Sequence, residues 1–250
     1  RPGTPLRFML LYELASATVG LVMRVLYRAR ALGAARIPSK GPVLLLANHQ
    51  SYLDPPLVGV TVRCRHLDFL ARLGLFHSAP LAWLLASLNS VPIREEGGDA
   101  AAIKEILRRL EKGYAVLVFP EGTRSPDGAM RPFKRGVAVL VKRAKCPVVP
   151  VAIEGCYDAW PRERKAPRLL GQHVAVAYGD PIPHAELMAD GPDAALERLE
   201  DRIETMRMAL RRWMRRTSHG RYPPAGAGDL PGAKAGVTGG AGPGPRPVSG

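Results

Sequence analysis

Short apolar runs, each ended by polar or turn-forming residues, constrain the fold of this chain more than any other feature. Val43–Ala47 (VLLLA) is one such run, and it lies between Gly41-Pro42 and the polar pair Asn48-His49. Continuous apolar runs of this length are typical of strands that are buried on both faces of a sheet. Similar runs are Leu67–Ala71, Ala115–Phe119, Val148–Ile153 and Val174–Tyr178.

Helical stretches lie between these runs. They are Pro55–Val62, Pro80–Leu88, Ala100–Lys112, Val137–Ala144 and Ala194–Arg216. The alternation predicts a layered α/β fold, with a mostly buried sheet flanked by helices. In such folds the loops at strand ends carry the chemistry. The polar residues after the runs at 43–47 and 115–119 are therefore candidate site residues.

Residues 6–28 predict one further helix, which has two unlike sides. Polar and small residues, among them Glu13, Gly20 and Arg24, recur every three or four positions, and the rest of the circumference is apolar. A spanning helix needs roughly 20 apolar residues with few charges, and Glu13 and Arg24 interrupt this run. We therefore expect a helix in the membrane interface, with packing on the protein's own core as the alternative. A cleaved signal peptide is not expected, because no convincing small-residue cleavage site follows.

Composition divides the chain into three segments. Residues 1–30 hold the membrane-associating helix, and residues 31–217 hold the α/β domain. Residues 218–250 are rich in Gly, Pro and Ala and have almost no large apolar residues. Such a segment buries too little apolar surface to offset the entropy of ordering it, so we predict a disordered tail.

The net charge is +14, from 36 Lys and Arg against 22 Asp and Glu. This charge suits an anionic partner, either nucleic acid or membrane headgroups. Aromatic residues make up only 6%, and the absence of a zinc-finger spacing or an RNP-like aromatic run argues against nucleic acid. We expect the last helix to end in a solvated basic face. Its arginines are Arg207, Arg211, Arg212, Arg215 and Arg216.

The three cysteines, Cys64, Cys146 and Cys156, are widely spaced and odd in number. This pattern is not that of a disulfide framework or of a metal site. A reducing, cytosolic compartment is the simplest account.

The first polar cluster is Asn48–Asp54, which follows a predicted buried strand. A histidine there, His49, can take a proton from an alcohol, since imidazole titrates near neutral pH. Asp54, five residues later, can orient one ring nitrogen and stabilise the imidazolium. The spacing leaves a structural alternative open, because Ser51-x-x-Asp54 matches a capping box and Asp54-Pro55 a helix start.

Two further clusters hold arginines. Arg94 ends the segment Val91–Arg94, where a solvated surface arginine is the alternative. The loop 119–128 (FPEGTRSPDG) follows another predicted strand, and its Arg124 can clamp a phosphate through a bidentate fork. Glu121 can orient that arginine or bind a substrate hydroxyl, although Pro-Asp-Gly at 126–128 is also ordinary turn chemistry.

Taken together, these segments resemble the motifs of the 1-acylglycerol-3-phosphate acyltransferase family of glycerolipid acyltransferases. NHQSYLD at 48–54 is similar to the family's NHxSxxD motif, and FPEGTRS at 119–125 to its third motif. VPIR at 91–94 corresponds to the second motif and VVPVAIEG at 148–155 to the fourth. The four occur in the family's order, and the resemblance covers roughly residues 6–217.

The resemblance implies roles for individual residues. His49 would deprotonate the acceptor hydroxyl, which then attacks a thioester carbonyl, and Asp54 would orient His49. No metal or bound cofactor is implied. The residues implied to bind the acceptor's glycerol phosphate are Arg94, Glu121, Gly122, Thr123, Arg124 and Lys134.

The same resemblance implies a reaction. An acyl chain would pass from acyl-CoA or acyl-carrier protein to the free hydroxyl of 1-acylglycerol 3-phosphate, giving phosphatidate for phospholipid biosynthesis. The partners would be a phospholipid surface, the lysophospholipid acceptor and the acyl donor, and not nucleic acid. The protein would lie on the cytoplasmic face of the membrane, peripheral or monotopic. The alternatives are another acceptor (glycerol 3-phosphate, another lysolipid or a glycolipid) or a non-catalytic membrane-binding module.

Overall fold

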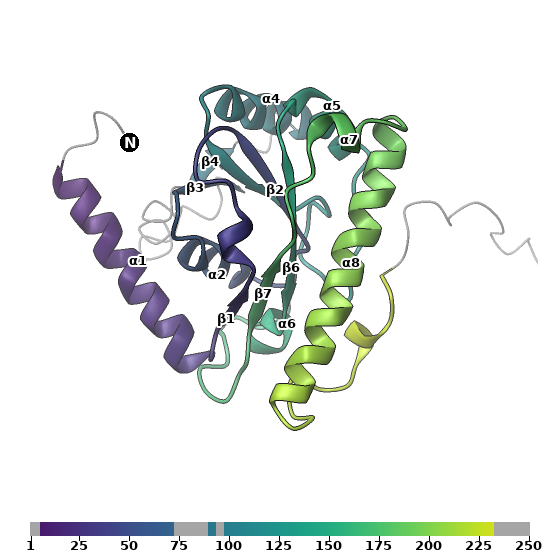
Figure 1. Cartoon of the computed structure of the whole chain (residues 1–250). Helices are drawn as coiled ribbons and strands as arrows, with labels where there is room; N and C mark the ends of the chain where they lie inside the picture. The colour runs from purple at the N-terminus through teal and green to yellow at the C-terminus, as the bar shows by residue number, and fades with distance from the viewer. Residues whose placement is uncertain (1–5, 73–89, 94–97, 233–250) are drawn as a thin grey trace, which may run out of the picture.

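The computed structural model describes residues 6–72, 90–93 and 98–232. It contains a seven-stranded sheet in the order β1-β7-β6-β2-β5-β3-β4, with helices on both faces (Figure 1). The strands are β1 (Arg30–Leu32), β2 (Val43–Ala47), β3 (Leu67–Arg72), β4 (Ser90–Ile93), β5 (Ala115–Val118), β6 (Val148–Glu154) and β7 (Ala175–Tyr178). The helices are α1 (Leu6–Leu26), α2 (Asp54–Thr61), α4 (Gly98–Glu111), α5 (Gly136–Ala144), α6 (Cys156–Ala159), α7 (His184–Leu187) and α8 (Pro192–Thr217), with the 3-10 turns η1 (Ala34–Arg36) and η4 (Ala227–Asp229).

This architecture confirms the predicted α/β fold. The five predicted apolar runs form β2, β3, β5, β6 and β7, and four of the predicted helices form α2, α4, α5 and α8. The short strands β1 and β4 were not predicted. The predicted helix at 80–88 lies outside the described residues.

The sheet core depends on strands that are apolar on both faces. All five residues of β2 are buried. Val43, Leu45 and Ala47 pack with residues of α1 and α2 in one cluster, whereas Leu44 and Leu46 pack with α4, α5 and α8 in another. The result is three layers, helix, sheet and helix.

Strand direction brings the polar loops to one edge of the sheet. Strands β6, β2, β5, β3 and β4 are parallel along the sheet order. Their carboxyl ends, which include Ala47 of β2, Val118 of β5 and Glu154 of β6, therefore lie at one edge, called here the carboxyl edge. Strand β7 is antiparallel to β6 and starts at this edge.

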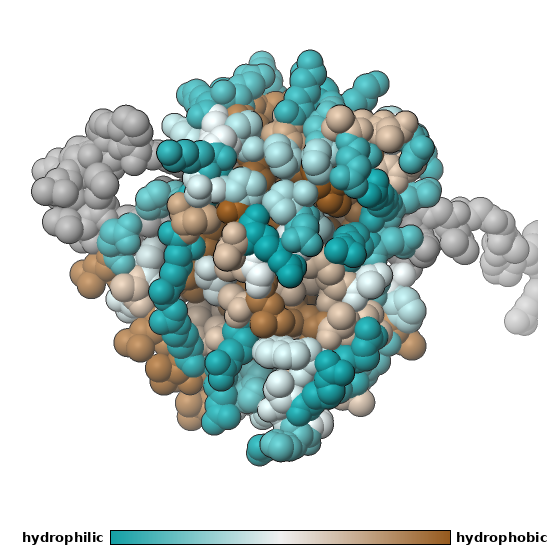
Figure 2. Space-filling model, in the orientation of Figure 1, coloured by the Kyte–Doolittle hydropathy of each residue, from teal (hydrophilic) through white to brown (hydrophobic). Residues whose placement is uncertain are grey.

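Helix α1 packs against α2 at the outside of the sheet (Figure 1). Met23 and Tyr27 at its end are buried, whereas Leu14, Leu21 and Val25 are 66%, 63% and 64% exposed. Figure 2 shows hydrophobic side chains along this outer side. Among the described residues, no helix has the length and apolarity needed to cross a bilayer. The predicted interfacial position of α1 stays a prediction.

The prediction of a disordered tail from residue 218 is wrong for residues 218–232. These residues lie along α8 (Figure 1). The carboxylate of Asp229 pairs with Arg211 at 2.8 Å and with Arg215 at 2.6 Å. The prediction considered only apolar burial, but ion pairs and backbone carbonyls that accept hydrogen bonds from α8 arginines hold this segment. Residues 233–250 lie outside the described part of the chain.

The turn after β6 gives a test of the fold. Gly155 has φ +83°, and a Cβ there would overlap the carbonyl oxygen of His173. Gly113 has φ +78° with no neighbour near its Cβ position. Gly113→Ala should therefore cost only the left-handed backbone conformation, about 1–2 kcal/mol, and Gly155→Ala should cost clearly more. Urea denaturation of both variants measures the difference, and equal losses would contradict the close approach of His173.

Candidate active site

The carboxyl edge begins with a clamp between β2 and β6. The side-chain amide of Asn48 donates to the carbonyl oxygen of Ile153 at 2.9 Å. Its carbonyl oxygen accepts from the Ile153 backbone N–H at 2.7 Å. The clamp fixes the backbone directly before His49.

His49 and Asp54 form a hydrogen-bonded pair. The distance from His49 Nδ1 to Asp54 Oδ2 is 2.8 Å, and the Asp54 side chain is fully buried. The same oxygen accepts the backbone N–H groups of Gln50 at 2.6 Å and Ser51 at 2.7 Å. A carboxylate only accepts hydrogen bonds, so this contact assigns the proton to Nδ1 and leaves the Nε2 lone pair free to act as a base.

The contacts of Asp54 fit the structural alternative and the functional one at the same time. Asp54 is the first residue of α2, and the residue before it makes no side-chain cap. The Asp54 carboxylate instead closes the turn that leads into the helix. One side chain therefore shapes the turn and orients the imidazole.

The ring of His49 is also held from the side. It stacks on Phe119, with centroids 4.0 Å apart and an interplanar angle of 20°. The His49 side chain is 17% exposed. The imidazole thus keeps limited contact with solvent while its orientation is fixed by two neighbours.

Glu121 connects the two motif loops. Its Oε1 accepts the backbone N–H of His49 at 2.7 Å, and its Oε2 accepts that of Arg131 at 3.1 Å. Burial raises the pKa of this carboxyl to about 8, although the two backbone hydrogen bonds oppose the shift. Because both oxygens already have backbone donors, Glu121 is placed to hold the loops together.

Arg124 lies over the ring of Tyr52, with its Cζ 3.6 Å from the ring centroid. This contact links the 119–128 loop to the loop that carries His49. Burial lowers the pKa of the guanidinium. Its Nη1 is buried and has no hydrogen-bond partner among the described residues. A buried donor of this kind is a strong candidate to bind a phosphate oxygen.

The remaining predicted site residues are placed less directly. Gly122 has φ +70°, and a Cβ there would overlap the side-chain stem of Lys134. Lys134 pairs with Asp99 of α4 at 3.0 Å. Thr123 is half-buried in the same turn. Arg94 follows the last residue of β4 but lies outside the described residues.

Comparison with known proteins places this geometry in a family. The acyltransferase family model matches residues 28–154. The chain belongs to the acyltransferase family.

Individual relatives agree with this assignment. The chain is 32% identical over 188 residues to a 1-acyl-sn-glycerol-3-phosphate acyltransferase of Pseudomonas aeruginosa, which covers 74% of this chain and 68% of that protein. It is 30% identical over 132 residues to the chloroplastic 1-acyl-sn-glycerol-3-phosphate acyltransferase BAT2 of Brassica napus, which is 52% of this chain and 38% of the relative. The match therefore spans well under half the length of the plant relative.

A solved structure has the same fold. The crystal structure of a 1-acyl-sn-glycerophosphate acyltransferase from Thermotoga maritima superimposes with a TM-score of 0.67. The identity is 24%, and the match covers 81% of this chain and 79% of that one. The α/β arrangement of this acyltransferase is thus an arrangement that a solved protein also adopts.

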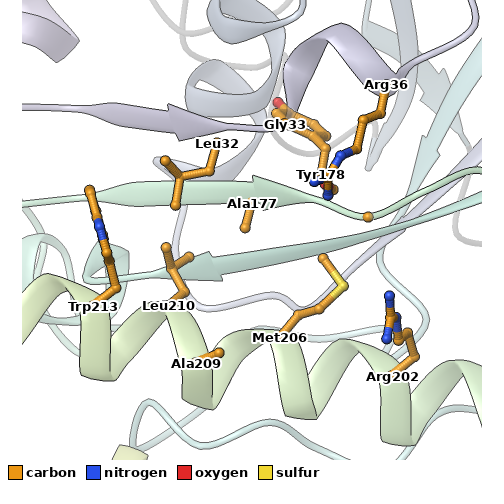
Figure 3. A pocket seen from close by; sticks show the side chains of 11 residues that line it. Leu32, Gly33, Arg36, Ala177, Tyr178, Arg202, Met206, Ala209, Leu210 and Trp213 are labelled. Atoms are coloured by element: carbon orange, nitrogen blue, oxygen red, sulfur yellow. The ribbon is translucent and has the colours of Figure 1, made fainter.

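The chain also has a pocket of about 340 Å³ away from His49 (Figure 3). It lies between β1, β7 and α8, and its lining includes Leu32, Arg36, Tyr178, Met206 and Trp213. It contains none of the predicted site residues. The pocket is therefore separate from the predicted site residues at the carboxyl edge.

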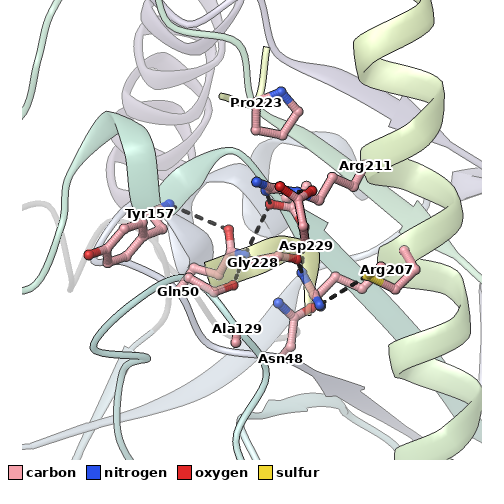
Figure 4. A network of polar contacts seen from close by, with 12 residues as sticks. Asn48, Gln50, Ala129, Tyr157, Arg207, Arg211, Pro223, Gly228 and Asp229 are labelled. Carbon is pink, nitrogen blue, oxygen red and sulfur yellow. Dashed lines mark hydrogen bonds and ion pairs between the residues drawn. The ribbon is translucent and has the colours of Figure 1, made fainter. Parts of the chain in front are cut away.

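A buried polar network connects the loop that carries His49 to the rest of the protein (Figure 4). The side-chain amide of Gln50 donates to the carbonyl oxygen of Gly128 at 3.0 Å and to Glu154 Oε1 at 3.3 Å. Glu154 pairs with Arg207 at 3.0 Å and with Arg211 at 2.7 Å. The loop beside the His49–Asp54 pair is thus linked to α8.

The predicted solvated basic face of the last helix is wrong at two positions. Arg207 is fully buried and Arg211 is 4% exposed. A signal was present in the sequence, because Glu154 ends an otherwise apolar buried strand. A carboxylate at such a position requires a cationic partner, and arginines spaced at i and i+4 on one helix face can supply it.

Removing one of these arginines tests the network. Arg207→Met should lower the free energy of unfolding by about 3–5 kcal/mol, because buried carboxylates lose a partner. Arg212 lies on the same helix and is exposed, so Arg212→Met should change the free energy of unfolding by no more than about 0.5 kcal/mol. Urea denaturation of both variants gives the comparison. Equal stabilities would mean that the Glu154 pairs do not support the fold.

Proposed function

We propose that this chain is a 1-acylglycerol-3-phosphate O-acyltransferase, which moves a fatty acyl chain from acyl-CoA or acyl-carrier protein to the free hydroxyl of its acceptor and forms phosphatidate. The observation that carries the proposal is the His49–Asp54 pair at 2.8 Å, with Nε2 free as a base. The names of the relatives support the choice of acceptor.

The reaction starts at Nε2 of His49. This nitrogen takes the proton of the acceptor hydroxyl as the hydroxyl oxygen bonds to the thioester carbonyl carbon. The buried Asp54 carboxylate stabilises the imidazolium that forms. Collapse of the tetrahedral intermediate breaks the carbon–sulfur bond. The thiolate leaves without much acid assistance, and the proton passes from His49 to it or to water.

The acceptor phosphate binds at Arg124. The guanidinium is positioned by stacking on Tyr52. Its buried Nη1 has no hydrogen-bond acceptor among the described residues. An arginine held in one plane suits a phosphate group, to which it can donate two parallel hydrogen bonds. Lys134, already paired with Asp99, supplies further positive charge near Gly122.

The protein works at a membrane surface, on its cytoplasmic face, as a peripheral or monotopic enzyme. Support comes from α1, whose outer side leaves Leu14, Leu21 and Val25 exposed. The three cysteines are all free thiols, which agrees with a reducing compartment.

Thiol release from long-chain acyl-CoA, with and without lysophosphatidate, tests the reaction. The wild-type protein should release thiol only with acceptor, and His49→Ala should lower turnover by about 10²–10⁴-fold, because it lacks the general base. The matched control is His184→Ala. His184 lies on α7, where its Nε2 is 3.2 Å from the Lys142 carbonyl oxygen, and turnover should be unchanged.

Failure with acyl-CoA alone would be followed by acyl-carrier protein as donor and by glycerol 3-phosphate, other lysolipids and glycolipids as acceptors. Activity only with one of these would replace the acceptor or donor in the proposal. Silence with all of them, with wild-type fold retained, would favour a non-catalytic membrane-binding module.

The phosphate site has its own test. Arg124→Ala should raise the KM for lysophosphatidate by about 10- to 100-fold, since it removes charge-assisted hydrogen bonds. The KM for acyl-CoA should change little. Arg143→Ala serves as control, because Arg143 is an exposed residue at the far end of α5. A rise in both KM values, or no preference for phosphate-bearing acceptors, would contradict the assignment.

A further inference from the structure

The loop at 161–173 joins α6 to β7 at the carboxyl edge. Strand β6 ends at Glu154, and the antiparallel β7 starts at Ala175, its register partner. The loop between them therefore emerges at the edge of the sheet that also carries His49.

The end of α1 meets this loop. The backbone N–H of Val174 donates to the carbonyl oxygen of Tyr27, and that of Arg30 donates to Val174, both at 3.0 Å. The exposed apolar side of α1 thus leads toward the same edge. The loop and the helix end form one continuous part of the surface.

The loop presents two large apolar side chains next to each other. Leu169 is 57% exposed and Leu170 is 76% exposed. Residues 162–166 and 168–171 are all exposed. Exposed single leucines are common on protein surfaces, but an adjacent pair at the tip of an ordered loop needs a reason.

The loop that carries these leucines is positively charged. The loop carries Arg162, Arg164, Lys165 and Arg168 against the single acid Glu163. Three further arginines, Arg28, Arg221 and Arg30, lie near the end of the loop. Their charges act on His173, whose pKa is lowered first by burial and further by these arginines. Leucines in a cationic loop suit an anionic bilayer, because its phosphate groups can pair with the cations and its apolar chains can take up the leucines.

The loop is held in shape by its own contacts. The backbone N–H of Arg168 donates to Ala159 at 2.8 Å, and its guanidinium donates to the carbonyl oxygen of Asp158 at 2.7 Å. His173 stacks on Tyr222 with ring centroids 4.5 Å apart. The backbone that carries the leucines is therefore ordered before binding, so the loop loses little conformational entropy when the leucines insert.

Trp160, the residue directly before the loop, touches the candidate active site. The hydroxyl of Ser51 donates to the carbonyl oxygen of Trp160 at 2.9 Å. The Trp160 ring meets the Tyr52 ring edge-on at 5.4 Å. Tyr52 is the residue on which Arg124 stacks. The apolar tip and the phosphate-binding arginine are thus connected through a few direct contacts.

We propose that the loop 161–173 is a membrane-contact surface separate from α1, which binds an anionic bilayer by inserting Leu169 and Leu170 while its cations pair with lipid phosphates. It holds the Arg124 side of the active site against the bilayer. The binding itself does not depend on the proposed reaction. Only the delivery of a bilayer-resident acceptor to His49 rests on that function.

Vesicle co-sedimentation of the full chain tests the contact. On vesicles of phosphatidylcholine and phosphatidylglycerol, Leu169→Ser with Leu170→Ser should weaken binding about 10- to 100-fold, because apolar burial is lost. The control is Val139→Ser with Leu230→Ser, which removes two residues that are 49% and 65% exposed elsewhere. It should bind as the wild type does. Circular dichroism and Tm confirm that all variants fold.

Charge is tested by Lys165→Glu, which should weaken binding to the mixed vesicles about tenfold or more and have little effect on pure phosphatidylcholine. Lys112→Glu, an exposed residue before β5, makes the same charge change and should be neutral. Wild-type binding by the leucine variant would overturn the proposal. Loss of vesicle binding with Lys165→Glu but not with the leucine variant would mean an electrostatic contact with lipid phosphates without insertion of the leucines, and would also overturn the proposal.

Activity separates this proposal from the reaction. The leucine variant should keep wild-type turnover on a short-chain, water-soluble lysophosphatidate and lose about tenfold on acceptor embedded in vesicles. Loss on both acceptors would assign the loop to the site itself and reject a membrane role. If no protein shows turnover but the variants still lose vesicle binding, the proposed function fails and the membrane contact stands.

Discussion

A carboxylate in the middle of the fold, that of Glu154, determines how the rest is assembled. It lies at the end of a strand with every residue buried, where an unpaired charge would be strongly destabilising. Arg207 and Arg211 neutralise it from α8. The two arginines also donate hydrogen bonds to the carbonyl oxygen of Gly228 and to the carboxylate of Asp229, which holds residues 218–232 in place. One buried charge thus joins the sheet, the last helix and the segment beyond it.

The layered fold could be predicted because its central strands are apolar on both faces. A run such as Val43–Ala47 has few alternatives to a buried strand, and such runs set the order of the layers. The edge strands β1 and β4 were missed because neither is a continuous apolar run: β1 starts with Arg30 and is exposed along its length, and β4 starts with Ser90 and contains Pro92. Residues 218–232 were missed for a different reason. Their order comes from polar partners distant in sequence, which local composition does not register.

The site was predictable to the extent that its residues are close in sequence. His49 and Asp54 are five residues apart, and one turn brings them together. The backbone role of Glu121 could not be read in this way, since its two donors come from His49 and from Arg131 and depend on parallel β2 and β5. The stacking of Arg124 on Tyr52 likewise joins two loops that only the sheet brings together. Long-range geometry, more than residue type, was the missing information.

Asp54 Oδ2 serves the imidazole and two backbone amides with one atom. The shape of the loop and the position of the proton on the His49 ring therefore depend on the same oxygen atom. An asparagine at this position would point either its NH₂ group or an uncharged oxygen at the three donors. The NH₂ group cannot accept their hydrogen bonds, and the uncharged oxygen accepts them more weakly. The turn would then loosen, and the His49 ring would lose its fixed tautomer. A change at this one oxygen therefore alters the turn and the orientation of the His49 ring together.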